Sequence, residues 1–325
     1  MKVLLTGASG FVGSHILDRL LARGISTVIV LRPTSPRRFI ESRLPEVEVR
    51  TASLSDPRSL EQAMRDITHV VHCAGAVKAV RTDEFYAVNQ LGTRAVVEAA
   101  NKAGISRFVH VSSLAAAGPR SPDAPAHEFD PPRPVSQYGQ SKLAAEREVE
   151  QGCRAEWVIV RPPGVYGPRD TAFLPLFRAV KSHLLPDVGG GRLALSLVFV
   201  KDLAEAIVRC LEAPAAPGRT YFATGAEVVS ATQFGELAAR ELGTWTFRLP
   251  LPTGLLWPVC VVQEWFSHLT GKPHLFSRQK YAEITAPGWV CDGTRLRAEL
   301  GIECATPLRE GIRQTAEWYR AAGWL

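Results

Sequence analysis

Short apolar runs alternate with helical patterns through the first half of the chain. Six runs predict buried strands, and they are Val3–Leu5, Val28–Leu31, Val47–Ala52, His69–Cys73, Phe108–Val111 and Trp157–Val160. Between them, apolar residues recur at helical spacing over Phe11–Arg23, Asp83–Ala103 and Tyr138–Gln151, and Gly24 closes the first of these helices. The alternation predicts βαβ units, and therefore an α/β fold with a doubly wound parallel sheet.

The regular pattern fades after Pro162, where prolines, glycines and tryptophans become frequent. Two further strands, Leu197–Val200 and Thr220–Phe222, are predicted to return to the sheet, with a helix from Asp202 between them. We therefore expect a sheet-forming, cofactor-binding part and a smaller, mostly C-terminal substrate-binding part. The first comprises 1–165 with 195–224 returning to it, and the second comprises 166–194 and 225–325.

Composition and charge argue against a nucleic-acid-binding protein. The 325 residues are 46% hydrophobic, which is enough for a large core. Lys and Arg number 38 against 32 Asp and Glu, and the resulting net charge of +6 is scattered along the chain. This distribution argues against nucleic-acid binding. We expect a small-molecule substrate instead.

The cysteines and the start of the chain indicate a cytoplasmic protein. Met1 and Lys2 lead directly into a strand, without the apolar segment of a secretory signal. The six cysteines show neither a Cys-x-x-Cys motif nor metal-ligand spacing: Cys73, Cys153, Cys210, Cys260, Cys291 and Cys304. We expect reduced, mostly buried thiols and no metal site.

The most apolar stretch of the chain is Gly254–Val262. It is too short to span a bilayer and contains Pro258, so we expect no transmembrane segment here. A helix of this composition can lie on a membrane, face an apolar substrate or pack in the core. We expect a packed core helix.

A glycine motif, Gly7-x-x-Gly10-x-x-Gly13, follows the first strand and opens the first helix. The first glycine permits a tight turn, the second lets backbone amides approach a pyrophosphate, and the third allows close packing of helix and strand. The helix N-terminus carries a partial positive charge that favours phosphate. This arrangement predicts the dinucleotide site of a Rossmann fold.

The loop after the second strand indicates which dinucleotide binds. NAD enzymes place an acid there to hold the ribose hydroxyls, whereas an arginine accommodates the 2′-phosphate of NADP. This chain has Arg32 followed by Pro33–Arg38, with no acid in the loop. Since a guanidinium can pair with phosphate in a bidentate manner, we predict NADP(H) over NAD(H).

Tyr138 and Lys142 are the candidate acid–base pair. Residues four apart lie on one face of a helix, and an ammonium beside a phenol lowers the phenol pKa, which is ordinarily about 10. Ser112 and Ser113 end the fifth strand, at the sheet edge where open α/β proteins bind ligands. A serine hydroxyl there can hold a substrate carbonyl while Tyr138 delivers the proton.

At these residues the chain resembles the extended short-chain dehydrogenase/reductases of the NAD-dependent epimerase/dehydratase superfamily, along nearly its whole length. The motifs that carry the resemblance are Thr6-Gly7-x-x-Gly10-x-x-Gly13, His72-Cys73-Ala74-Gly75, Asn89 with Gly92-Thr93, Ser112-Ser113, Tyr138-Gly-x-Ser-Lys142 with Glu146, and Arg161-Pro162-x-x-Val165-Tyr166-Gly167-Pro168. The resemblance also suggests a homodimer through the helices at 83–103 and 138–151.

The resemblance implies roles for individual residues. Tyr138 is the expected acid–base residue, Lys142 binds the nicotinamide ribose and lowers the pKa of the tyrosine, and Ser113 orients the substrate oxygen. Asn89 is expected to support them from its helix. The cofactor-binding residues implied in this way, together with those argued above, are Gly7, Ser9, Gly10, Phe11, Val12, Gly13, Arg32, Ser53, Leu54, Cys73, Ala74, Gly75, Asn89, Ser112, Tyr138, Lys142, Pro162, Gly164 and Val165.

Three departures narrow the subfamily. The resembling sugar-nucleotide dehydratases carry Asp-Glu after the catalytic hydroxyl residue, whereas Leu114–Ala117 follows here. The epimerases usually carry Asn where this chain has Gly164, and Ser53 replaces the usual Asp near the adenine. The pattern is closest to the dihydroflavonol reductase and 3β-hydroxysteroid dehydrogenase branch, which acts on ketones or secondary alcohols of bulky apolar molecules.

Three functions follow from this comparison. The favoured one is an NADP(H)-dependent ketone reductase or alcohol dehydrogenase. The others are a sugar or nucleotide-sugar epimerase and a non-catalytic cofactor-sensing protein. Apolar residues after Pro162 are predicted to line a pocket for a bulky hydrophobic substrate or to form the core of the smaller part. They are Phe173, Phe177, Leu184, Leu185, Leu255, Leu256, Trp257, Trp265 and Phe266.

Overall fold

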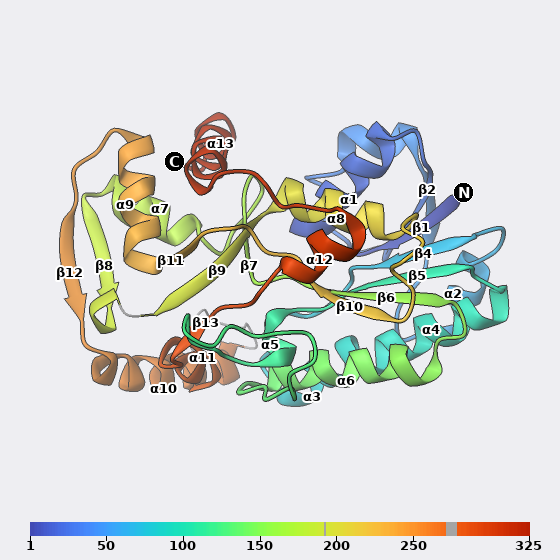
Figure 1. The fold of residues 1–325 in the computed structure, drawn as a ribbon, viewed down its shortest axis with the longest axis horizontal. Coiled ribbons are helices and arrows are strands. Elements are labelled where there is room, and N and C mark those ends of the chain that lie inside the picture. Colours follow the sequence, from blue (N-terminus) through green and yellow to red (C-terminus); the bar gives the residue numbers. More distant parts are fainter. Residues whose placement is uncertain (192, 271–277) are drawn as a thin grey trace.

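Seven parallel strands form the large sheet of the protein (Figure 1). The structure is a computed structural model that describes residues 1–191, 193–270 and 278–325. In spatial order the strands are β10 (Arg219–Phe222), β6 (Glu156–Arg161), β5 (Arg107–Val111), β4 (His69–His72), β1 (Lys2–Thr6), β2 (Ser26–Leu31) and β3 (Glu48–Thr51). The six strands predicted in the first half of the chain are all present, and the doubly wound fold is confirmed.

Helices cover both faces of this sheet. On one face lie α1 (Phe11–Ala22) and α8 (Val200–Cys210), and on the other lie α2 (Pro57–Ala63), α4 (Gly92–Ala103) and α6 (Gln137–Gly152) (Figure 1). Successive strand residues point to opposite faces, so Leu5 packs under the first layer and Leu4 under the second. Both faces are therefore dry, which explains the continuous apolar runs in the sequence.

The strand order reverses at β1, which pairs with β2 on one side and with β4 on the other. In open parallel sheets such a reversal leaves a crevice beyond the carboxyl ends of the strands, where ligands bind. The glycine motif follows β1 directly, so the fold places it at this crevice.

The predicted helix at 83–103 is a continuous helical run with an irregular middle. It comprises α3 (Thr82–Phe85), the π-helical turn η2 (Tyr86–Leu91) and α4. A π turn inserts an extra residue into the helical repeat, and such turns are frequent at functional sites. Asn89 lies buried within it.

The smaller part is built on two further sheets. Strand β9 (Ala194–Phe199) pairs with β11 (Val228–Ser230), β13 (Gly288–Trp289) and β7 (Gly164–Tyr166), whereas β12 (Phe247–Leu251) pairs with β8 (Leu184–Val188). The prediction that the strand at 197–200 returns to the large sheet is therefore wrong. Only β10 joins that sheet, where it pairs with β6, while α8 packs against α1 from outside the sheet.

Three helices enclose the core of the smaller part: α7 (Leu174–Lys181), α9 (Ala231–Leu242) and α13 (Leu308–Ala321). Phe177, Phe234 and Tyr319 are fully buried there. The centroid of the Phe177 ring lies 5.1 Å from that of Tyr319 and 6.1 Å from that of Phe234. The remaining elements are η1 (Glu41–Glu46), α5 (Leu114–Ala117), η3 (Gly189–Gly191), α10 (Thr253–Thr270), α11 (Arg278–Ile284) and α12 (Thr294–Leu300).

The apolar residues after Pro162 divide between two environments. Phe177 and Leu185 belong to the core of the smaller part, as one of the two predictions stated. Leu255, Trp257 and Trp265 instead lie exposed on α10, so the prediction that this stretch is a packed core helix is wrong. The side chain of Phe266 lies outside the described residues. All six cysteines are free thiols and four are buried, as predicted.

Candidate active site

Residues from six neighbouring strands meet at the carboxyl edge of the large sheet. The glycine motif follows β1, Arg32 follows β2, and Ser53 and Leu54 follow β3. Beyond β1 on the other side, three more segments follow β4, β5 and β6 at the same edge: Cys73–Gly75, Ser112–Ser113 and Pro162–Val165. The fold thus gathers the residues predicted for the cofactor from distant parts of the sequence.

The glycine loop fits a closely approaching ligand. Gly7 has φ of +77°, and a Cβ there would lie 2.7 Å from the backbone nitrogen of Ala74. A Cβ on Gly13 would lie 2.0 Å from the Gly7 carbonyl oxygen, so α1 starts directly against the loop. The Gly10 amide donates to the Gly7 carbonyl at 3.0 Å. Ser9, Phe11 and Val12 flank these glycines and are partly exposed at the helix N-terminus.

The segment after β4 is fixed by Asn89 from the π turn. The Asn89 side chain accepts from the Ala76 amide at 2.7 Å and donates to the Ala76 carbonyl at 3.0 Å and to the Ser141 hydroxyl at 2.9 Å. A Cβ on Gly75 would lie 3.1 Å from Asn89 Oδ1 and 4.0 Å from Lys142 Nζ. The absence of a side chain at Gly75 therefore leaves room beside Lys142.

The loop after β2 carries unpaired positive charge. Arg32, Arg37 and Arg38 are exposed, and no described carboxylate forms an ion pair with any of them. The Arg32 amide donates to the Ser35 hydroxyl at 3.0 Å, which turns the loop back at the strand end. These guanidinium groups are available to a phosphate.

The far side of this loop rests on the C-terminal residues. The Arg38 guanidinium lies 4.3 Å from the Phe39 ring centroid and 5.3 Å from that of Trp324. Trp324 stacks on Tyr319 of α13 at 5.8 Å, and its carbonyl accepts from Arg178 of α7 at 3.1 Å. The loop that follows β2 is thus held by the smaller part.

Ser113 and Tyr138 are brought together at the ends of β5 and of α6. Ser113 caps α5, where its hydroxyl accepts from the Ala115 amide at 3.1 Å, and this hydroxyl lies close enough to the Tyr138 phenol to influence the pKa of the phenol. The Phe85 ring lies 6.1 Å from the Tyr138 ring and holds it in place. Two hydroxyl groups therefore point into one site, and both residues are partly exposed.

The electrostatics of Tyr138 differ from the sequence-based expectation. Burial raises the pKa of its phenol to about 12, the Ser113 hydroxyl opposes this, and Glu283 and Cys73 add to it. The Lys142 ammonium donates to the Val111 carbonyl at 2.8 Å, and Lys142 is not among the groups that shift this pKa. Burial lowers the pKa of Lys142 to about 8, with Glu146 and Cys73 opposing.

A buried ion pair anchors α6 to the sheet one turn beyond Lys142. The Glu146 carboxylate accepts from Arg161 Nε at 2.8 Å and from Arg161 Nη2 at 2.6 Å, and it also accepts from the Ser112 hydroxyl at 2.5 Å. The side chains of Glu146 and Arg161 are only 1% and 6% exposed. This network joins β5, β6 and α6, so it fixes where Lys142 and Tyr138 project.

The remaining predicted residues lie around this centre. The Pro162 carbonyl accepts from the Leu114 amide at 2.8 Å, which ties β6 to α5, and Val165 pairs with Val198 in β9. Gly164 is exposed, and a Cβ there would lie 2.8 Å from Leu197 Cδ2. At the other end, Leu54 touches Gly92, where a Cβ would lie 3.0 Å from Leu54 Cδ1.

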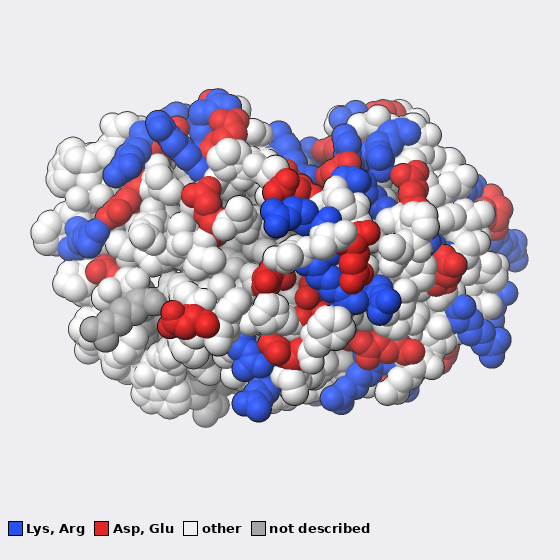
Figure 2. Space-filling view, in the orientation of Figure 1, with Lys and Arg blue, Asp and Glu red and all other residues white. Residues whose placement is uncertain are grey.

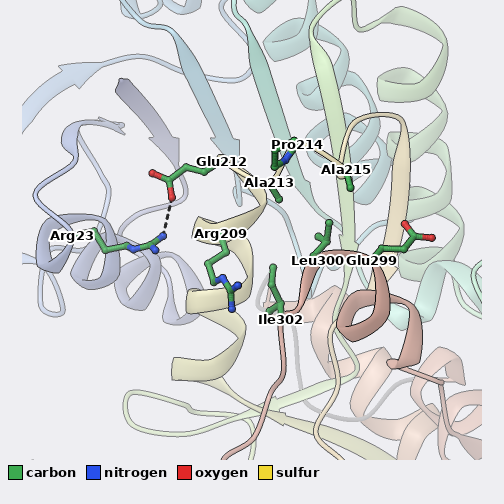
Figure 3. A pocket seen from close by; sticks show the side chains of 9 residues that line it. All are labelled: Arg23, Arg209, Glu212, Ala213, Pro214, Ala215, Glu299, Leu300 and Ile302. Atoms are coloured by element: carbon green, nitrogen blue, oxygen red, sulfur yellow. Dashed lines mark hydrogen bonds and ion pairs between the residues drawn. The ribbon is translucent and has the colours of Figure 1, made fainter.

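Other cavities and charged clusters lie apart from this centre. A cavity of about 270 Å³ is formed by the ends of α1, α8 and α12, where Arg23 and Glu212 pair at 3.2 Å (Figure 3). Two of its walls, Arg23 and Glu212–Ala215, precede β2 and β10, so this cavity lies at the amino edge of the sheet, opposite the glycine loop. Among the described residues, no cluster of His, Cys, Asp and Glu is arranged to hold a metal ion.

The geometry agrees with sequence comparisons. Residues 3–223 match the NAD dependent epimerase/dehydratase family. The chain belongs to this family. It is 34% identical over 326 residues to the ceramide reductase of Caulobacter vibrioides, covering 99% of this chain and 96% of that protein. It is also 34% identical over 250 residues to the 4-hydroxy-2-methyl-3-oxo-4-farnesyl-3,4-dihydroquinoline-1-oxide ketoreductase of Stigmatella aurantiaca, covering 75% of this chain and 74% of that protein.

Solved structures of the family share the whole architecture. The UDP-glucose 4-epimerase of Thermus thermophilus, in complex with NAD, superposes with a TM-score of 0.79 at 26% identity, covering 99% of this chain and 100% of that chain. Family and relatives together show that this protein is a nicotinamide-dependent oxidoreductase of the extended short-chain type. The predicted superfamily, fold and enzyme class are confirmed.

Two residues of the site had no predicted role in the sequence. Phe85 packs against Tyr138 from the helical run that precedes α4, and Glu283 of α11 lies close enough to influence the Tyr138 phenol. Neither belongs to a motif, and α11 comes from the irregular C-terminal half. The sequence identifies Glu146 only as part of a motif. In the structure it lies at the centre of the buried network with Ser112 and Arg161.

Proposed function

We propose that this protein is an NADP(H)-dependent oxidoreductase that interconverts a ketone and a secondary alcohol on a bulky, largely apolar substrate. The observation that carries the proposal is the placement of the Ser113 hydroxyl beside the Tyr138 phenol, with Lys142 one turn further along α6 and the apolar segment α5 directly after Ser113. Two hydroxyl groups can hold and protonate one oxygen atom. No acid of α5 can add the second proton transfer that a dehydratase needs.

In this proposal the bound dinucleotide supplies the hydride for reduction or accepts it for oxidation. Ser113 donates a hydrogen bond to the substrate oxygen and orients it toward the Tyr138 phenol. Because the pKa of that phenol is raised to about 12, it keeps its proton at neutral pH and can act as the acid for ketone reduction. Lys142 binds the ribose beside Gly75, and Asn89 supports this segment through its hydrogen bonds to Ala76 and Ser141.

The apolar nature of the substrate is supported by the relatives. One is named for ceramide and another for a ketone that carries a farnesyl group. The substrate-binding residues are proposed to come from the part of the chain outside the large sheet, 166–194 and 225–325. A homodimer through α4 and α6 also belongs to this proposal, and sedimentation velocity of the purified protein tests it.

A substrate screen separates the candidate functions. We expect the purified enzyme to oxidise NADPH in the presence of hydrophobic ketones. Conversion of UDP-glucose without net oxidation of NADPH would favour the epimerase instead, and tight NADPH binding without turnover of any substrate would favour the non-catalytic cofactor sensor.

Replacing Arg32 by Asp is expected to reverse the cofactor preference. The substitution removes a cation from the end of β2 and adds a carboxylate that repels the 2′-phosphate. Charged hydrogen bonds contribute about 1.5–3 kcal/mol, so NADPH affinity should fall by about one to two decades while NADH affinity changes little. Fluorescence titrations of both cofactors measure this.

Arg154→Asp is a suitable control for that experiment. Arg154 is also exposed, but it follows α6 and precedes β6, at the amino edge of the sheet. The Arg154→Asp substitution makes the same change in net charge as Arg32→Asp, but far from the loop after β2. Preference of the wild-type protein for NADH would contradict the proposed role of Arg32.

A further inference from the structure

Helix α10 presents a large apolar surface to solvent. Six of its apolar side chains are between 41% and 62% exposed, and we call them the α10 surface: Leu255, Trp257, Val259, Val261, Val262 and Trp265. Contiguous apolar surfaces of this kind mark sites of interaction with proteins or membranes.

The helix is apolar around its whole circumference at these positions. Among the side chains of α10 that the structure describes, Leu256 and Cys260, one turn apart, are the buried apolar ones, and the α10 surface occupies other sides of the helix. Between Arg248 and Glu264 the sequence has no charged residue. Helices that are hydrophobic all round belong in a core or in a membrane, and the protein itself does not cover this one.

Exposed apolar residues begin before the helix. Trp245, Phe247 and Leu249, in and before β12, are 69%, 62% and 39% exposed. Figure 1 places α10 at the lower left of the molecule, where Figure 2 draws mostly uncharged residues together with some that the structure does not describe. From Trp245 to Gln263 the sequence thus supplies apolar and aromatic groups with a single charged residue, Arg248, which pairs with Glu236.

The α10 surface is connected to the candidate active site through α11. Helices α10 and α11 pack together, with the rings of Trp257 and Tyr281 5.2 Å apart. Two residues further along α11 is Glu283, whose charge adds to the raised pKa of the Tyr138 phenol and whose carbonyl accepts from Trp289 Nε1 at 2.8 Å. One short helix therefore separates the exposed surface from the catalytic tyrosine.

We propose that the α10 surface seats the protein on an anionic phospholipid bilayer, with α10 lying in the interfacial layer. Tryptophan is enriched at membrane interfaces, and α10 and the segment before it expose three tryptophans. A protein-binding site of this size would carry a polar rim, which the uncharged stretch does not provide. The net charge of +6, although scattered along the chain, gives the whole molecule a long-range attraction to anionic lipid.

The helix rests on the bilayer and does not cross it. In the parts of the chain that the structure describes, no helix combines the length and apolar character that a membrane span requires. With α10 in the interface, an apolar molecule can pass from the lipid to α11 and Tyr138 without crossing water. The docking is independent of the proposed reaction, because it is measured without substrate or cofactor.

Vesicle flotation tests the proposal. We expect the wild-type protein to float with vesicles of equal parts phosphatidylcholine and phosphatidylglycerol. The double variant Val261→Glu with Val262→Glu should lose at least about tenfold in bound fraction, because carboxylates are costly to bury at the interface. The matched control is Val49→Glu with Val228→Glu, whose valines are 41% and 44% exposed on β3 and β11. This control should float like wild type.

Quenching of tryptophan fluorescence by brominated phosphatidylcholine, mixed into the same vesicles, gives a second measurement that needs no charged variant. Quenching should be strong in the wild-type protein and weaker in Trp257→Phe with Trp265→Phe, but not in Trp157→Phe. A wild-type protein that stays in solution and is not quenched would overturn the proposal. So would a wild-type dimer that the glutamate variant dissociates, without vesicle binding, because the α10 surface would then contact a second copy.

Discussion

Replacing Tyr138 by Phe is expected to lower kcat by about 10²–10⁴-fold, the usual contribution of a general acid–base residue. In the proposed mechanism the phenol beside the Ser113 hydroxyl gives its proton to the substrate oxygen. Cofactor affinity should stay near the wild-type value, because the Phe ring still packs against Phe85. Steady-state turnover with NADPH and a cofactor titration measure the two effects.

Tyr86→Phe provides a matched control for this variant. Tyr86 also carries its phenol to α6, where it donates to Gln137 at 3.1 Å and to Gln140 at 3.2 Å. The control removes the same atom from a neighbouring position outside the Ser113 pair, so turnover should be unchanged. A Tyr138→Phe enzyme with near-native kcat would exclude Tyr138 as the proton donor.

The second large effect concerns stability. Glu146→Ala should lower the free energy of unfolding by about 3–5 kcal/mol, because it leaves the Arg161 guanidinium charged and buried without its partner. The Ser112 hydroxyl loses its acceptor in the same variant. Urea unfolding, followed by circular dichroism, measures the change.

Glu148→Ala separates the buried pair from an ordinary surface pair on the same helix. Glu148 pairs with Arg94 at 2.7 Å, but the Arg94 side chain is 49% exposed, so about 0–1 kcal/mol is expected. Replacing both Glu146 and Arg161 by Met should restore much of the lost stability, because no unpaired charge remains. If Glu146→Ala cost no more than Glu148→Ala, the buried network would not be holding α6.

The large sheet was predictable from the sequence because its strands are buried on both faces. Such strands are continuous apolar runs, and the helices between them show the helical period. The glycine motif and the position of Ser113 at a strand end could be placed from local rules alone. Asn89 could be placed on a helix, but the π turn that aims its side chain at Ala76 and Ser141 leaves no mark in the spacing.

The errors arose where the outcome depends on distant partners. A short apolar run such as 197–200 does not indicate which sheet the strand joins. Residues 197–199 of this run form the end of β9, which pairs with β7, β11 and β13. An all-apolar helix has the same pattern whether the protein covers it or not, so α10 was assigned to the core. The spacing of Tyr138 and Lys142 gives a shared helix face, but not that the Lys142 ammonium turns to the Val111 carbonyl.

The contact between Arg38, Phe39 and Trp324 couples the position of the loop after β2 to the position of the smaller part. Trp324 is held by α7 and α13, both in the smaller part, whereas Phe39 belongs to the loop that follows β2. If a bulky substrate enters by a hinge movement between the large sheet and the smaller part, there are two possibilities. Either the loop after β2 moves together with the smaller part, or the contact between Trp324 and Phe39 breaks. Under the proposed function, the entry of substrate and the binding of the cofactor's phosphate would therefore both depend on the contact between Trp324 and the loop that carries Arg38 and Phe39.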